Sequence, residues 1–226
     1  MAGYDGRRQT LSNGSLVTEM SDYTLPPHST LLCGMHGSGK STFALRYLLN
    51  APAACRFVFD DYGQAAARLK MPHASTAHEL EAALATRWVL FNPHRMFAGK
   101  LDDAFRFFCR WVMETSRRGP GKKLVLVDEV WRFCTPNYIP EEFAEVAQIG
   151  RADGVELVSA TQVPHKLNSS LTGMSTELVC FRLDERLALE CVRSLGMDPA
   201  QVQELPLGSF IARNRLTRGQ LTGKLF

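Results

Sequence analysis

The chain has 226 residues and a net charge of +3, with 45% apolar and 22% charged residues. This length suits one domain with a sizeable core, and the composition excludes disordered and fibrous proteins. No run of about 20 apolar residues is present, and the polar Met1–Gln9 segment has no apolar stretch of a signal peptide. The six scattered cysteines form no C-x-x-C pair, which favours reduced thiols over disulfides or zinc. We therefore expect a soluble protein without stable membrane insertion.

The first specific pattern in chain order is a glycine-rich segment. Gly34 to Ser41 reads GMHGSGKS and matches the phosphate-binding loop (Walker A) G-x-x-x-x-G-K-[ST], whose backbone N–H groups surround nucleotide phosphates. An apolar strand pattern at 29–33 precedes the loop, and a helical pattern at 40–50 follows it. These flanking patterns disfavour the alternative of a glycine-rich turn that only links a strand to a helix. The expected ATP-binding residues are Gly34, Gly37, Ser38, Gly39, Lys40, Ser41 and Thr42.

Two side chains of this loop have specific expected roles. Lys40 is predicted to reach the β- and γ-phosphates and so to take part in catalysis, and the Ser41 hydroxyl to ligate Mg²⁺. The helix that follows also points its positive N-terminus at the same anion.

Apolar segments alternate with helical patterns along the rest of the chain. Strands are predicted at 56–59, 87–91, 123–127, 155–160, 177–181 and 209–212, and helices at 64–69, 76–85, 101–117, 141–149 and 184–195. Such alternation predicts an α/β fold with a mainly parallel central sheet covered on both faces. We expect an ATPase domain at 29–212, an N-terminal arm at 1–28 with a weak strand pattern at 15–18, and a basic C-terminal tail at 213–226.

A pair of acidic residues ends the strand predicted at 123–127. Asp128 and Glu129 follow this apolar segment as in the Walker B pattern. Asp128 is expected to hold Mg²⁺, and Glu129 to polarise the water that attacks ATP. The alternative is a surface pair of acids at a strand end, which the phosphate loop in the same chain disfavours.

A polar pair, Thr161 and Gln162, ends the strand predicted at 155–160. In P-loop ATPases with a strand inserted between those of the two Walker motifs, a polar side chain at this point contacts the γ-phosphate and its water. Gln162 suits that role because its amide both donates and accepts hydrogen bonds. The alternative is that these residues only cap a turn before Pro164.

The run from Gly150 to Pro164 carries a family resemblance. It reads GRADGVELVSATQVP and, with the phosphate loop and the Asp128–Glu129 strand, resembles the HerA/FtsK superfamily of DNA-pumping ATPases. Within it, the chain looks most like the genome-packaging ATPases of tailless, membrane-containing double-stranded DNA viruses. The resemblance implies a RecA-like, additional-strand, three-layer P-loop NTPase that hydrolyses ATP with Mg²⁺. It further implies a ring, expected to be a homo-hexamer, that threads double-stranded DNA into a preformed capsid and docks on capsid or vertex proteins.

Departures from the cellular members favour the viral interpretation and a location in the virion or the host cytoplasm. We find no pattern for the β-barrel domain of cellular HerA, for a membrane anchor, or for the winged helix of FtsK. Three alternatives stay open. One is a filamentous-phage assembly ATPase of the zonula-occludens-toxin type, which the run 128–133 resembles. The others are a cellular HerA-like DNA-processing motor and a slow nucleotide-dependent DNA-binding switch, and Glu129 and Gln162 argue against the switch.

Arg151, inside the resembling run, is the expected arginine finger that acts on the ATP of a neighbouring subunit. Such a residue accelerates hydrolysis by about 10³–10⁵-fold. The alternative is an arginine that satisfies backbone carbonyls at a helix end, and Arg182 and Arg186 are rival candidates for the finger.

Basic side chains enrich two further regions and are candidate phosphate contacts for DNA. The first contains Arg106, Arg110, Arg117, Arg118, Lys122 and Lys123, and the second, the tail, contains Arg213, Arg215, Arg218 and Lys224. A solvated helix face and a mobile tail are the alternatives. The segment 168–170 is a candidate pore loop that would contact the DNA backbone.

Overall fold

The structure, a computed structural model, describes residues 29–226 of the chain. The arm predicted at 1–28, with its weak strand pattern, lies outside the described residues. The strands are β1 (Ser29–Cys33), β2 (Cys55–Phe59), β3 (Trp88–Phe91), β4 (Lys123–Val127), β5 (Val155–Thr161), β6 (Glu177–Phe181), β7 (Ser209–Asn214) and β8 (Gln220–Lys224). The helices are α2 (Lys40–Asn50), α3 (Gln64–Leu69), α4 (Ala77–Thr86), α5 (Leu101–Arg118), α6 (Glu141–Gln148), α7 (Ser169–Met174), α8 (Arg186–Ser194) and α9 (Pro199–Gln203). The 3₁₀ turns are η1 (Pro93–Arg95), η2 (Val130–Arg132), η3 (Gly150–Asp153) and η4 (Pro164–Lys166).

All of these strands join one sheet, in the order β3-β2-β4-β5-β1-β6-β7-β8. The pairs from β3 across to β6 are parallel, whereas β7 is antiparallel to β6 and β8 is antiparallel to β7. β5 lies between β1 and β4, and it is the additional strand of the predicted fold. The predicted α/β class with a mainly parallel sheet is confirmed.

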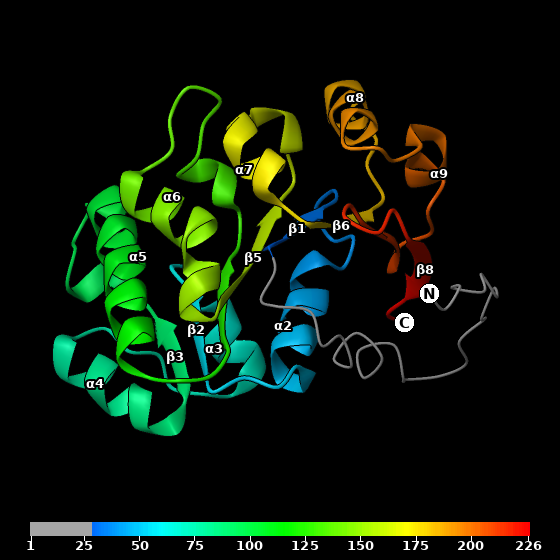
Figure 1. The fold of residues 1–226 in the computed structure, drawn as a ribbon. Helices are drawn as coiled ribbons and strands as arrows, with labels where there is room; N and C mark the ends of the chain where they lie inside the picture. The colour runs from blue at the N-terminus through cyan, green and yellow to red at the C-terminus, as the bar shows by residue number, and fades with distance from the viewer. Residues whose placement is uncertain (1–28) are drawn as a thin grey trace, which may run out of the picture.

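Helices cover both faces of the sheet (Figure 1). On one face, Phe43 of α2 packs in the same cluster as Leu124 of β4. On the other face, Phe105 of α5 and Phe143 of α6 pack in a cluster with Phe57 of β2. Because helices bury the sheet from both sides, all five residues of β4 and all seven of β5 are buried. No helix within residues 29–226 combines the length and hydrophobicity needed to cross a bilayer.

The register of the parallel strands brings three predicted site segments to one edge of the sheet. Cys33 of β1 is level with Thr161 of β5, and Val127 of β4 is level with Ser159 of β5. The residues after these strands therefore emerge at the same carboxyl-terminal edge, where open α/β sheets bind their ligands.

Aromatic packing anchors the segment that follows β4. The Phe133 ring stacks on the Phe105 ring at 4.1 Å between centroids and meets the Phe59 ring edge-on at 5.3 Å. Val130 in η2 is fully buried in the same cluster. These contacts fix the backbone immediately after Glu129, and they hold that residue at the sheet edge.

The predicted basic tail at 213–226 is wrong as a description of structure, because half of its residues belong to the sheet. β7 continues to Asn214, and β8 pairs with it from Gln220 to Lys224. The Asn214 carboxamide accepts the N–H groups of Leu216 and Thr217, which closes the connecting turn. β8 has no apolar pattern because it is an edge strand whose side chains are mostly exposed.

Two short helices, α7 and α9, were not predicted. The side chain of Asn168 caps α7 by accepting the Ser170 N–H at 2.9 Å, and that of Asp198 caps α9 by accepting the Ala200 N–H at 3.0 Å. The segment 168–170, predicted as a candidate pore loop, is therefore the start of a helix rather than a loop.

The first basic region, on and after α5, is largely neutralised by carboxylates that lie far away in the sequence. Arg106 and Arg110 both bind Glu142 of α6, and Arg117 binds Glu145 and Asp153. Lys122 pairs with Glu156, while the Lys123 ammonium is buried among backbone carbonyls. The structure thus favours the alternative of a solvated helix face over a DNA-binding patch here.

The double ion pair at Glu142 predicts a measurable pH dependence of stability. Hydrogen bonds from Arg106, and then from Arg110, lower the pKa of Glu142 to about 2 from its ordinary 4.5. Because the folded-state pKa is depressed, the stabilisation is complete above pH 4.5 and is lost as the pH falls toward 2. We expect Glu142→Gln to lower the unfolding temperature at neutral pH, and the difference from wild type to vanish as the pH approaches 2.

Thermal unfolding followed by circular dichroism between neutral pH and pH 2 tests this expectation. Glu141→Gln is the matched control, because Glu141 is exposed and has no ion pair among the described residues. An equal pH dependence in wild type and Glu142→Gln would contradict the assignment.

Candidate functional site

The glycine-rich segment forms a tight loop between β1 and α2. Gly37 has φ 72° and Gly39 has φ 115°, a backbone conformation that residues with a Cβ rarely adopt. Gly34 is needed for another reason, since a Cβ there would lie 2.6 Å from Ser38 Oγ and 2.7 Å from Phe181 Cβ. The three glycines of the predicted motif therefore each meet a steric requirement of the loop.

The Lys40 side chain folds back over this loop. Its side chain is buried, and Nζ donates to the backbone oxygens of Gly34 at 2.8 Å and Met35 at 3.0 Å. Burial lowers the pKa of Lys40, while the negative charges of Glu129 and Asp128 oppose that effect. The loop thus holds an ammonium group that an entering phosphate could bind.

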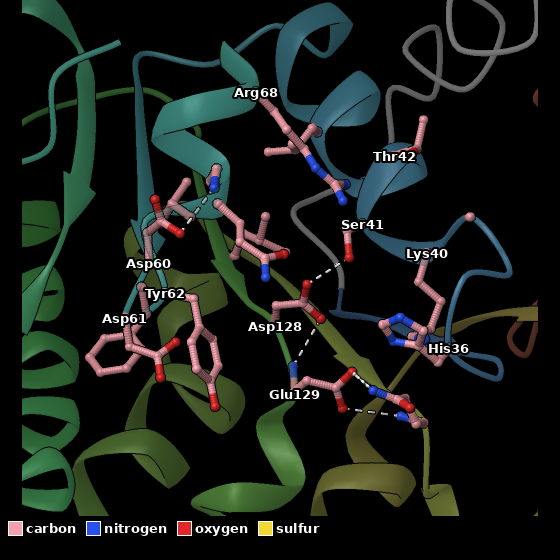
Figure 2. Close-up of a pocket in the computed structure, with 18 of the residues that line it drawn as sticks. His36, Lys40, Ser41, Thr42, Asp60, Asp61, Tyr62, Arg68, Asp128 and Glu129 are labelled. Atoms are coloured by element: carbon pink, nitrogen blue, oxygen red, sulfur yellow. Dashed lines mark hydrogen bonds between the residues drawn. The ribbon is translucent and has the colours of Figure 1, made fainter. Parts of the chain in front are cut away.

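Ser41 and Asp128 meet although 87 positions separate them in the sequence. The Ser41 hydroxyl donates to Asp128 Oδ2 at 2.8 Å (Figure 2). A hydroxyl and a carboxylate oxygen are hard ligands of the kind that Mg²⁺ prefers, so this pair fits the ion. No group of three or more Asp, Glu, His and Cys among residues 29–226 could hold a metal by itself. Ser41 and Asp128 would therefore supply only part of the coordination shell of Mg²⁺. Nucleotide phosphates and water would supply the remaining ligands.

The Glu129 carboxylate is held by two partners from different segments. Its Oε1 accepts from Gln162 Nε2 at 2.6 Å, and its Oε2 accepts from Trp131 Nε1 at 2.9 Å. The Glu129 backbone has φ 47°, an unusual conformation for a residue with a side chain. Glu129 and Gln162, predicted from separate motifs, are therefore in direct contact at the end of β4 and β5.

These groups line one cavity of about 520 Å³ at the carboxyl-terminal edge of the sheet. Lys40, Ser41 and Thr42 enter it from the α2 side, and Asp128, Glu129 and Gln162 from the β4 and β5 side. The walls combine a buried cation, carboxylates and backbone N–H groups at a helix start, which can bind a phosphorylated ligand and a divalent cation.

Comparisons with known proteins give a relative in sequence and solved structures of similar fold. No protein-family model matches the chain. Over 154 residues, 61% of this chain, it is 30% identical to the DNA translocase SftA of Bacillus subtilis, but it spans only 16% of that protein's length. The genome packaging NTPase B204 from Sulfolobus turreted icosahedral virus 2, solved with AMPPCP, has a TM-score of 0.63 and 15% identity and covers 90% of this chain and 100% of its own.

The bacterial conjugative coupling protein TrwB has a TM-score of 0.58 and 9% identity, over 99% of this chain and 94% of that chain. At such identities the solved structures establish the fold, which is that of RecA-like P-loop ATPases. The resemblance to the HerA/FtsK superfamily is confirmed. 

Several polar side chains near the cavity of this HerA/FtsK-like chain were not predicted as site residues. Arg68 of α3 lines the cavity and reaches toward Ser41 (Figure 2), and it has no hydrogen bond or ion pair within residues 29–226. The Arg132 guanidinium pairs with Asp61 and lies 4.9 Å from the centre of the Tyr62 ring. No motif marks these residues, because their places depend on how α3 and η2 pack beside β2.

Asp60, directly after β2, also lines the cavity. Its carboxylate accepts the N–H groups of Ala65 at 3.0 Å and Ala66 at 2.8 Å, at the start of α3. Asp60 therefore lines the cavity while its oxygens cap a helix.

Gly34 and Ser38 of the phosphate loop do not line the cavity, although their neighbours in the loop do. Among the four predicted catalytic residues, Arg151 is the one that the structure does not bring to the cavity. It lies in η3, before β5, and so at the opposite edge of the sheet from the phosphate loop. Its exposed side chain has no hydrogen bond or ion pair within the described range. The rivals do have partners, since Arg182 pairs with Asp184 and Arg186 with Glu190. Arg151 can therefore act on a nucleotide only in another subunit.

Proposed function

We propose that this chain is a Mg²⁺-dependent ATPase that drives double-stranded DNA and packages a viral genome into a preformed capsid. The observation that carries the ATPase part is the contact of Glu129 with Gln162 in the cavity that also holds Lys40 and the Ser41–Asp128 pair. A protein that only binds nucleotide needs neither a carboxylate to activate water nor an amide beside it.

Each side chain has a defined part in the proposed hydrolysis. Lys40 and the loop N–H groups bind the phosphates and neutralise the charge that develops on them. Ser41 and Asp128 would hold Mg²⁺, which supplies Lewis-acid polarisation of the phosphate oxygens. Glu129 accepts a proton from the attacking water once its bond to Gln162 is exchanged for that water, and Gln162 is then free to bind the γ-phosphate.

The contact between Glu129 and Gln162 also supplies a reason for hydrolysis to wait for a complete substrate. While Gln162 Nε2 and Trp131 Nε1 bind the carboxylate oxygens, fewer lone pairs of Glu129 are available to hold an attacking water. A ligand group that draws Gln162 away would release the base. We propose that the γ-phosphate performs this release.

The DNA part of the proposal is supported by the relatives. SftA, which is similar to 61% of this chain, is a DNA translocase, and B204, whose whole length aligns with 90% of this chain, is a genome packaging NTPase. We base the packaging part of the proposal on the alignment with the whole length of B204. We further propose a homo-oligomeric ring, a hexamer, that docks on capsid or vertex proteins in the virion or the host cytoplasm.

Stimulation of ATP hydrolysis by DNA tests the proposal. We expect duplex DNA to raise the steady-state rate several-fold, with the stimulation falling steeply as salt rises, because phosphate contacts release counterions. The Lys40→Ala variant, expected to be inactive with and without DNA, controls for contaminating ATPases. A wild-type rate that duplex DNA leaves unchanged at low salt would contradict the DNA motor.

A further inference from the structure

An aromatic side chain remote in sequence lines the same cavity as the phosphate loop. Phe226 is 64% exposed and borders the cavity together with His36, Gly37 and Gly39 of the loop. An apolar side chain stabilises a fold through the surface that it buries, and most of the Phe226 side chain stays exposed to solvent. An exposed ring at the rim of a ligand cavity is therefore a candidate contact for the ligand.

Backbone hydrogen bonds tie the segment that carries this ring to the loop and to α2. Leu225 N donates to Gly208 O at 2.8 Å, and Gly208 N donates to Ser38 O at 3.2 Å. The Arg46 guanidinium of α2 donates to Leu225 O at 2.8 Å. These hydrogen bonds hold the backbone next to Phe226 close to the phosphate loop, independently of any contact that the Phe226 ring makes.

The ring and its neighbour also pack on two glycines with positive φ. A Cβ on Gly208 would lie 2.6 Å from Phe226 Cε2, and a Cβ on Gly39 would lie 3.0 Å from Leu225 Cδ1. The absence of side chains at Gly208 and Gly39 therefore allows the β8 end to lie close against the loop.

The order of strands indicates which end of a bound nucleotide meets Phe226. β1 has β5 and then β4 on one side, and β6, β7 and β8 on the other. The predicted water activator Glu129 and the predicted Mg²⁺ ligand Asp128 follow β4, so the γ-phosphate end lies on the β4 side. The nucleoside end then points away from β4, toward the side where β7 and β8 lie. Figure 1 places β8 across the sheet from β2 and β3.

The other exposed aromatic side chain of the cavity is on the wrong side for the base. Tyr62 is 66% exposed and follows β2, beyond β4, near the γ-phosphate end. Its ring already lies 4.9 Å from the Arg132 guanidinium.

We propose that Phe226 stacks on the base of the bound nucleoside triphosphate and so completes the binding site. The ligand that it recognises is a nucleobase, and because every base has a π-face the ring adds affinity without selecting one base. The proposal rests on the proposed function only in requiring that the cavity binds a nucleoside triphosphate.

Binding of ATP and of inorganic triphosphate, measured by calorimetry, tests this assignment. We expect Phe226→Ala to weaken ATP binding by about 5- to 150-fold, the range of aromatic–base stacking, and to leave triphosphate binding unchanged. GTP binding should weaken to a similar extent, and Phe226→Trp should retain ATP affinity. Tyr138→Ala is the matched control, because the Tyr138 ring is also exposed but does not line the cavity, and it should bind ATP as wild type does.

Three results would overturn the assignment. They are unchanged ATP binding by Phe226→Ala, an equal loss of ATP and triphosphate binding, and a selective loss of ATP binding in Tyr62→Ala. Failure of the proposed function has a different signature. Suppose that the wild-type protein binds ATP, that Phe226→Ala binds it more weakly, and that duplex DNA does not stimulate ATP hydrolysis. These results together would support the base contact and contradict the DNA motor.

Discussion

Glu129→Gln is expected to slow ATP hydrolysis by about 10²–10⁴-fold, the usual contribution of a general base, while ATP binding stays within a few-fold of wild type. Glutamine keeps the size and the hydrogen-bonding geometry of Glu129, so the contact with Gln162 can persist in the amide form. What it loses is the capacity to accept a proton from water. Glu129 follows β4, whereas the phosphate loop follows β1, so the substitution leaves the loop unchanged.

Single-turnover hydrolysis of ATP, together with a binding measurement, separates these two effects. Glu114→Gln is the control, since Glu114 is exposed on α5 and has no ion pair within residues 29–226. Hydrolysis at the wild-type rate by Glu129→Gln would exclude Glu129 as the base. A parallel loss of binding and hydrolysis would instead indicate a structural role.

Arg151→Ala is expected to reduce hydrolysis by about 10³–10⁵-fold, the range of an arginine finger, with ATP binding retained. The structural reason is that Arg151 is an exposed cation without an ion pair in the described chain, at the edge of the sheet opposite its own phosphate loop. A guanidinium in that place can stabilise the developing phosphate charge only across a subunit interface.

Mixing two inactive variants gives the sharpest test of action between subunits. Arg151→Ala subunits keep an intact ATP site, and Lys40→Ala subunits keep an intact Arg151. Mixed assemblies should therefore recover activity that neither variant has alone. Arg186→Ala is the control and should stay active, because Arg186 is engaged with Glu190 on the surface of α8. Wild-type activity of Arg151→Ala alone would exclude the finger.

Patterns in the sequence predicted the sheet well because the central strands are buried on both faces. β4 and β5 read as apolar runs, and the loop at 34–41 and the acids after β4 occupy fixed places relative to those strands. The register of the parallel strands then brings Ser41 to Asp128 and Glu129 to Gln162. No single motif predicts these contacts, because each joins residues of two different motifs.

The features that sequence analysis missed depend on contacts between distant segments. β8 has polar, exposed side chains, so the strand was predicted as part of a tail. For the cations of α5, the sequence left both a DNA contact and a solvated helix face open, because their partners, Glu142 and Glu145, come from α6. Phe226 could not be connected with the phosphate loop, since only the pairing of β8 with β7 brings the two together.

Displacement of a third strand from triplex DNA is the measurement that tests the central claim most directly, because it reports movement along the duplex rather than hydrolysis. We predict that wild-type protein with ATP and Mg²⁺ displaces the third strand, and that Glu129→Gln, which should still bind ATP, does not. Hydrolysis of ATP by the wild-type protein without any displacement, under conditions where duplex DNA is bound, would contradict a DNA-translocating motor.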